Sequence, residues 1–195
     1  MCKPRLTKIS KEEIVDFPLG KYTGEIVLIQ KRSQAEKAIE EIKKCNIIGM
    51  DTEARPAFRR GVSYPVSLVQ FATDKKVYLF RMLKTGPLQG IADILEDETK
   101  TKIGIAPGDD MKDLGKSIRF QPRNIIDLNK LALENGFESI GAKKLSALVL
   151  GFRISKAQQV SNWEAKELSK AQIDYAATDA WICREIYLRL NSAFP

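Results

Sequence analysis

Hydrophobic residues follow two patterns that alternate along most of the chain. Short runs rich in β-branched residues are typical of buried strands, whereas apolar residues spaced by three or four positions are typical of amphipathic helices. The predicted strands span residues 24–30, 46–50, 66–72, 77–81, 102–106 and 124–128. The predicted helices span residues 33–44, 88–95, 109–116 and 169–190, and the pattern is also helical between 127 and 150.

This order of elements predicts an α/β fold with a central mixed sheet of five or six strands and helices on both faces. No helix separates the second, third and fourth strands, which indicates an antiparallel meander. Ser33 is the expected N-cap of the first helix. The helix at 109–116 is expected to begin after a turn at Pro107 and Gly108.

A single domain is expected, because the chain has 195 residues, of which 44% are hydrophobic and 29% are charged. We interpret residues 1–23 as a basic leader and residues 24–195 as the domain. No apolar run approaches the roughly 18 residues of a membrane span, so we expect no membrane contact and no export. Cys2, Cys45 and Cys183 are too few and too widely separated for a disulfide framework or a cysteine zinc site, and a reducing cytoplasm is the expected location.

The chain contains no histidine, which excludes several classes of active site. A Ser-His-Asp triad, a Cys-His pair, a histidine-ligated zinc and a histidine general base all need imidazole. Any catalysis therefore has to use carboxylates, lysine, tyrosine or bound water. The net charge of +7 is compatible with an anionic partner such as nucleic acid, although a basic surface also serves solubility alone.

Two carboxylates, Asp51 and Glu53, directly follow the apolar run 46–50. Residues i and i+2 of a strand face the same side, so both carboxylates are expected on one face at the rim of a buried sheet. Such a pair is a natural metal platform. An Asp-x-Glu triplet also arises by chance as two solvated charges, so the pair needs partners from elsewhere in the chain.

A further carboxylate, Asp110, is predicted at the start of a helix. The helix dipole stabilises negative charge there, so a purely structural role is the alternative to metal binding. Asp109 is the alternative to Asp110 as the functional group or as an N-cap.

The last predicted helix carries Tyr175 and Asp179, four residues apart. This spacing places the phenol and the carboxylate one turn apart on the same face, with about 5 to 6 Å between their Cβ atoms. The small residues Ala176 and Ala177 leave that face open. The alternative is that Tyr175 is a core residue and Asp179 a surface charge. A surface charge is unexpected beside Ala180 and Trp181.

With these motifs the chain resembles the tyrosine branch of the DEDD superfamily of 3′-to-5′ exonucleases. This branch includes ribonuclease D and the Werner-syndrome exonuclease domain, and the chain looks most like its stand-alone bacterial members. The motifs that carry the resemblance lie at 48–53, 110–114 and 175–179, with further similarity at 66–70, 126–128 and 161–163. The absence of histidine agrees with the tyrosine branch, because the sibling branch uses a histidine at the position of Tyr175.

The resemblance implies a ribonuclease H-like fold and two divalent cations, Mg²⁺ or Mn²⁺, without an organic cofactor. By this resemblance Asp51, Glu53 and Asp179 bind the ion that activates the attacking water. Asp51, and Asp110 through water, bind the ion at the leaving 3′-oxygen. Tyr175 orients the water.

The function implied by the resemblance is removal of nucleoside 5′-monophosphates from the 3′ end of DNA or RNA, with a single strand as the expected substrate. The alternative is a catalytically inactive nucleic-acid-binding module of the same fold. In the basic segment 55–61, Phe58 is a candidate for stacking on the terminal base and Arg59 and Arg60 for contacting phosphates, with a solvated loop as the alternative. Asp127 and Trp163 are interpreted as a strand-end residue and a core residue.

Overall fold

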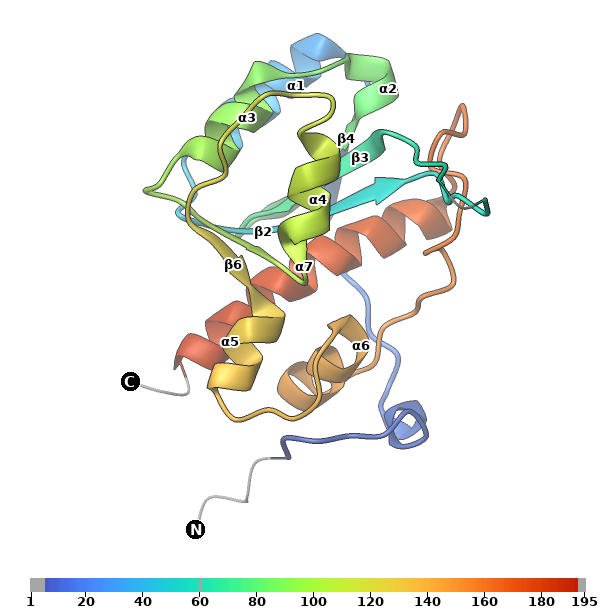
Figure 1. Cartoon of the computed structure of the whole chain (residues 1–195), viewed down its shortest axis with the longest axis vertical. Coiled ribbons are helices and arrows are strands. Elements are labelled where there is room, and N and C mark those ends of the chain that lie inside the picture. The colour runs from blue at the N-terminus through green and yellow to red at the C-terminus, as the bar shows by residue number, and fades with distance from the viewer. Residues whose placement is uncertain (1–5, 60, 193–195) are drawn as a thin grey trace.

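The computed structural model describes residues 6–59 and 61–192, and it contains one six-stranded sheet in the order β1-β4-β3-β2-β5-β6 (Figure 1). The strands are β1 (Glu25–Ile29), β2 (Ile47–Ala54), β3 (Val66–Ala72), β4 (Lys76–Arg81), β5 (Thr101–Gly104) and β6 (Ile125–Asp127). Strands β2, β3 and β4 form an antiparallel meander, whereas β1, β5 and β6 pair in parallel with their neighbours. The predicted mixed sheet and its meander are confirmed.

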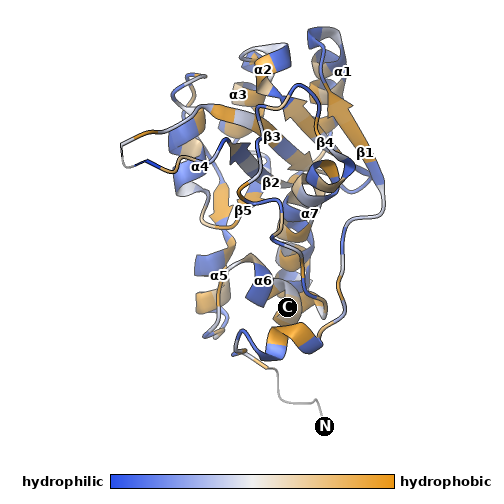
Figure 2. Ribbon diagram, turned by 90° about the vertical axis from the view of Figure 1, so that its right-hand side faces the viewer, coloured by the Kyte–Doolittle hydropathy of each residue, from blue (hydrophilic) through white to orange (hydrophobic). Residues whose placement is uncertain are grey.

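Helices cover both faces of this sheet, as predicted (Figure 1). The α-helices are α1 (Arg32–Ile42), α2 (Met82–Thr85), α3 (Gln89–Glu96), α4 (Pro107–Leu114), α5 (Leu128–Glu134), α6 (Ala142–Leu145) and α7 (Lys170–Ser192). A 3-10 turn, η1 (Glu13–Asp16), precedes β1, and a π-helical turn, η2 (Ser146–Leu150), follows α6. The apolar strands lie at the centre between the helices (Figure 2).

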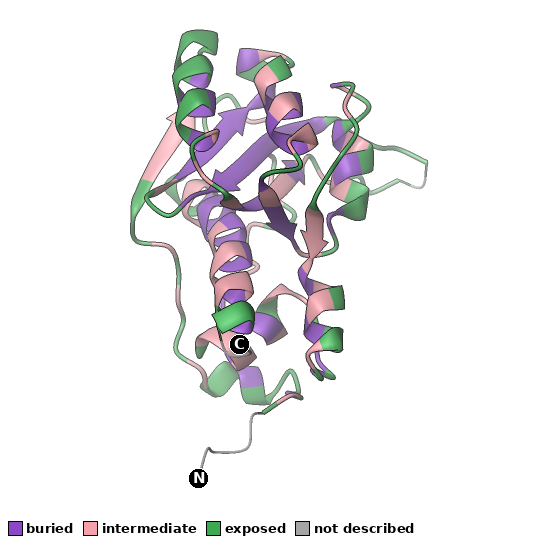
Figure 3. Cartoon of the chain, turned by 90° about the vertical axis from the view of Figure 1, so that its left-hand side faces the viewer, coloured by how far each residue is buried: buried purple, intermediate pink, exposed green. Residues whose placement is uncertain are grey.

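Strand β2 separates the two faces by simple alternation. Ile48 and Met50 are buried in the cluster that includes α1 and α3. Gly49 faces α7, and a Cβ atom there would lie 2.2 Å from the carbonyl oxygen of Ala180. Because glycine has no side chain, the backbone of α7 can lie directly on β2, and most of its inward face is buried (Figure 3).

Two predicted helix boundaries are wrong. Helix α1 begins at Arg32, before the expected cap Ser33, because the Gln34 side chain accepts hydrogen bonds from the backbone N–H groups of Gln30 and Lys31. Helix α4 begins at Pro107 rather than after it. The helical pattern predicted in 127–150 is confirmed by α5, α6 and η2, with Gly136 and Gly141 at positive φ between α5 and α6. The short helix α2 was not predicted.

The segment before β1 packs onto the domain. Ile9 and Ile14 are buried together with Ala147 of η2. The backbone N–H of Ile9 donates to Ser139 Oγ at 3.2 Å, and Thr7 O accepts from the backbone N–H of Ser139. This segment is therefore fixed beside α6. Cys2 lies outside the described residues, and none of the described helices has the length and apolar character needed to cross a bilayer.

Candidate metal centre

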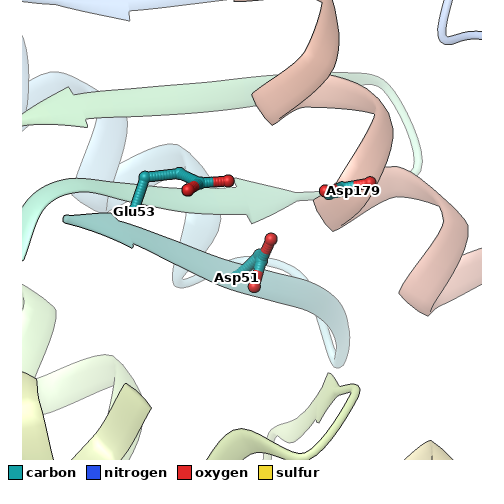
Figure 4. A group of neighbouring side chains, drawn as sticks. All are labelled: Asp51, Glu53 and Asp179. Atoms are coloured by element: carbon teal, nitrogen blue, oxygen red, sulfur yellow. The ribbon is translucent and has the colours of Figure 1, made fainter. Parts of the chain in front are cut away.

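Three of the predicted site residues, Asp51, Glu53 and Asp179, converge between β2 and α7. One carboxylate oxygen from each lies within 4.8 Å of the other two. Figure 4 shows the two side chains of β2 projecting toward the carboxylate of α7. The strand alternation places the first two on one face, and the close contact of α7 with Gly49 brings the third above them.

Among the described residues, Lys156 is the lysine that contacts this cluster, and it was not among the residues predicted from the sequence. Its Nζ donates hydrogen bonds to Asp179 Oδ2 at 2.8 Å and to Tyr175 Oη at 3.3 Å. The residue lies in a loop after η2, and no local pattern marks it. The pairing between Lys156 and α7 arises only from the tertiary fold.

The carboxylates of the cluster resist ionisation in the absence of a cation. Burial, followed by repulsion from Asp179 and Asp110, raises the pKa of Asp51 well above its usual range. Burial and the charge of Asp51 raise the pKa of Glu53 to about 10. Burial also raises the pKa of Asp179, opposed by its contact with Lys156. One lysine thus compensates only part of the clustered negative charge.

Tyr175 lies one turn before Asp179 and is buried, with its ring centroid 6.0 Å from that of Trp163. Burial, together with the charges of Asp179 and Glu53, raises the pKa of the phenol. The hydroxyl therefore stays protonated and can donate a hydrogen bond at neutral pH. Trp163 is fully buried in the core, as expected, and it fixes the position of the phenol ring.

Asp110 lies beside the cluster rather than within it. The Thr52 hydroxyl donates a hydrogen bond of 2.5 Å to Asp110 Oδ1. Burial raises the pKa of Asp110 to about 6, although this hydrogen bond opposes the shift. Asp109 is exposed, so of the two aspartates only Asp110 is held toward β2. The charge of Asp110 reaches Asp51, whose pKa it helps to raise.

A small pocket opens beside the carboxylates. It has a volume of about 270 Å³, and we call it the catalytic pocket; its lining comprises Asp51, Ile105, Ala142, Lys156, Gln159, Asp179 and Cys183. Burial raises the pKa of the Cys183 thiol, which donates to the Asp179 carbonyl oxygen at 3.2 Å. A protonated thiol in this contact is a structural group rather than a nucleophile.

The candidate substrate residues after β2 lie at a second, larger cavity. Phe58, 85% exposed, and Arg59 line a cavity of about 450 Å³ together with Arg55 and Tyr64. The Arg55 guanidinium lies over the Tyr64 ring, 4.8 Å from its centroid. Arg60 lies outside the described residues.

Asp127 has a structural role, as the sequence interpretation expected. Its side chain accepts hydrogen bonds from the backbone N–H groups of Asn129, at the start of α5, and of Ala106. It therefore caps α5 and holds the turn before α4, where Ala106 has a left-handed conformation.

The donor set fits a hard divalent cation. All three converging groups offer carboxylate oxygens, the ligands that Mg²⁺ and Mn²⁺ prefer. Asp179 Oδ1 is buried and has no hydrogen-bond partner among the described residues. Such an orphaned oxygen costs free energy unless a ligand satisfies it, and a cation held between the carboxylates would do so.

Comparison with known proteins agrees with this arrangement. The profile of a family described as 3′-5′ exonuclease matches residues 26–194. A 3′-5′ exonuclease of Arabidopsis thaliana is 30% identical over 192 residues, covering 88% of this chain and 65% of the plant protein. Exonuclease 3′-5′ domain-containing protein 2 of Drosophila melanogaster is 35% identical over 135 residues, covering 67% of this chain and 23% of the fly protein.

Solved structures show the same fold. The Nibbler exonuclease domain of Aedes aegypti superposes with a TM-score of 0.82 at 23% identity, covering 89% of this chain and 91% of that one. Escherichia coli ribonuclease D gives a TM-score of 0.75 at 21% identity, covering 88% and 46%. The expected ribonuclease H-like architecture is thereby confirmed. With a family profile matched over nearly its whole length, the chain belongs to the 3′-5′ exonuclease family, whose members use divalent metals.

Proposed function

We propose that this chain hydrolyses phosphodiester bonds at the 3′ end of a nucleic-acid strand and releases nucleoside 5′-monophosphates. The observation that carries the proposal is the convergence of Asp51, Glu53 and Asp179 within 4.8 Å, with Asp51 and Asp179 lining the catalytic pocket. These residues would hold two divalent cations, Mg²⁺ or Mn²⁺, with Asp110 contributing from α4. When bound, the cations supply an activated water and charge stabilisation at the leaving oxygen.

The protein side chains position the remaining reactants. The Tyr175 hydroxyl is protonated and close to Asp179, so it can orient the attacking water by a hydrogen bond. Phe58 and Arg59 offer an aromatic face and a positive charge to the terminal nucleotides, which favours an unpaired strand as substrate.

The proposed activity is tested with fluorescent DNA and RNA single strands of matched sequence, incubated with Mg²⁺, Mn²⁺ or chelator. Stepwise shortening from the 3′ end with either metal, and none with chelator, is the expected result. Binding of the strand without shortening in any metal would instead identify an inactive nucleic-acid-binding module. Comparing the two strands also gives the preference between DNA and RNA.

Tyr175→Phe is expected to lower kcat by about 10²-fold or more, because the variant loses only the hydroxyl that orients the water. KM and folding should change little, since the ring still packs on Trp163. Steady-state kinetics with a single strand and a thermal melt measure both. Full activity in the Tyr175→Phe protein would remove tyrosine from the mechanism.

A further inference from the structure

A basic cavity adjoins the catalytic pocket. It has a volume of about 350 Å³ and shares three lining residues with that pocket, namely Ala142, Lys156 and Gln159. We call this cavity the lysine groove. The shared residues place the groove and the pocket side by side.

The lining of the lysine groove is basic and contains no acidic residue. Lys11, Lys143 and Lys144 line it together with Lys156. In the described part of the chain, the first three form no salt bridge with a carboxylate. Ile14 and Ile140 add apolar surface between the charges. Uncompensated lysines around apolar surface suit a ligand that has both phosphates and flat or apolar groups.

The wall that carries Lys11 is held rigidly in place. Ile9 and Ile14 are buried on either side of Lys11 in the sequence. Glu138 and Ser139 donate backbone hydrogen bonds to Thr7 O, and Ser139 Oγ bonds to Ile9. The backbone of this segment is already ordered, so ligand binding does not require a further loss of its conformational entropy. The segment lies before residue 26, where the match to the family profile begins.

We infer that the lysine groove binds the sugar-phosphate backbone of the strand whose 3′ end occupies the catalytic pocket, an inference that rests on the proposed function. The carboxylate cluster by itself offers phosphates no positive charge, and the adjacent lysines supply the attraction that draws the strand toward it. Two adjoining cavities suit successive nucleotides of one strand. The N-terminal segment, through Lys11, is thus part of the substrate site.

The salt dependence of binding tests this inference. The test variant is Lys11→Ala/Lys143→Ala/Lys144→Ala, and the control is Lys37→Ala/Lys75→Ala/Lys84→Ala, which removes equal charge from residues outside the groove. Affinity for a fluorescent single strand of about ten nucleotides is measured by anisotropy in chelator between about 50 and 300 mM salt. Lys156 is left intact because it contacts Asp179.

Each phosphate contact with a single strand contributes about 0.7 to the slope of log K against log salt. The groove variant should therefore lose about 2 from this slope, whereas the control should lose little. Equal slopes in the two variants would overturn the inference. Binding is measured without metal, so this result does not depend on nucleotide release. Nucleotide release by the wild-type protein is the separate test of the proposed function.

Two further arms define the ligand and the role of the N-terminal segment. The inhibition constant of a free nucleoside 5′-monophosphate should be the same for the wild type and the groove variant, because the lysine groove is assigned to the strand. If the groove variant lost the same factor in affinity for the free nucleotide and for the strand, the inference would be contradicted. Lys11→Ala alone should lower the slope by about 0.7. Lys8 lies in the same segment, but its charge is paired with Glu138. Lys8→Ala should therefore leave the slope unchanged.

Discussion

Replacing Asp51 with asparagine is expected to reduce nucleotide release by a factor of about 10³ or more, because metal-bound charge stabilisation contributes several kcal/mol. Asp51 is the central residue of the proposed centre, since the charges of both Asp179 and Asp110 act on its carboxylate. The loss should appear in kcat with both Mg²⁺ and Mn²⁺. Steady-state kinetics with a single strand measure it.

The same substitution should stabilise the metal-free protein. Burial and neighbouring carboxylates raise the pKa of Asp51 and that of Glu53, the latter to about 10. The folded state therefore binds protons that the unfolded state, with carboxyl pKa values of about 4, has released. The stability of the wild type in chelator should fall as pH rises above about 4 toward 10, and the fall should be shallower for Asp51→Asn.

Thermal melts with and without Mn²⁺ separate this effect from general damage. Mn²⁺ should raise the Tm of the wild type, because the ion binds only the folded protein, and should have little effect on Asp51→Asn. Asp109→Asn is the matched control, since Asp109 is exposed, and it should keep both activity and the metal response. If Mn²⁺ raised the Tm of Asp51→Asn as much as that of the wild type, the metal would have to bind elsewhere.

Gly49→Ala is expected to damage stability and activity together. The added Cβ would lie 2.2 Å from Ala180 O and 2.9 Å from Arg184 N, both backbone atoms of α7. The helix has to move away from β2, at a cost of about 1–3 kcal/mol. Because Asp179 is next to Ala180, this movement separates it from Asp51, and a displacement of about 1 Å can cost about 10² in rate.

Gly108→Ala is the control for this substitution. Gly108 lies in α4, and a Cβ atom at this position would meet no neighbouring group within 4 Å, so alanine should keep activity and stabilise by about 0.5–1 kcal/mol. Denaturant unfolding and kinetics of the two variants provide the comparison. If Gly49→Ala retained wild-type stability, the tight contact between β2 and α7 would not determine the site geometry.

Local periodicity was enough to predict most strands and helices, and which site residues share a face of the same element. The strands of the meander and α7 have strong patterns, so their existence and type were predictable from residues close in the sequence. Asp51 and Glu53 share a face because strand side chains alternate, and Tyr175 and Asp179 share a face because they are four residues apart in a helix. These relations depend only on secondary structure.

Other features depended on contacts between distant segments. The expected cap Ser33 was displaced by hydrogen bonds that the Gln34 side chain accepts from the backbone, and the helical pattern in 127–150 was interrupted where Gly136 and Gly141 adopt positive φ. Lys156 has no sequence signal, yet it forms the ion pair with Asp179. Its role follows from the path of the loop after η2 across α7.

Side-chain periodicity was sufficient to predict which side chains share a face of β2 and of α7. The absence of histidine was sufficient to predict that the chemistry rests on carboxylates and a tyrosine. Only the tertiary structure decided that these two faces meet, through Gly49, and that Lys11 joins Lys143 and Lys144 beside them. The physical reason is that periodicity acts over a few residues, whereas burial and charge compensation act between segments that are far apart in the chain.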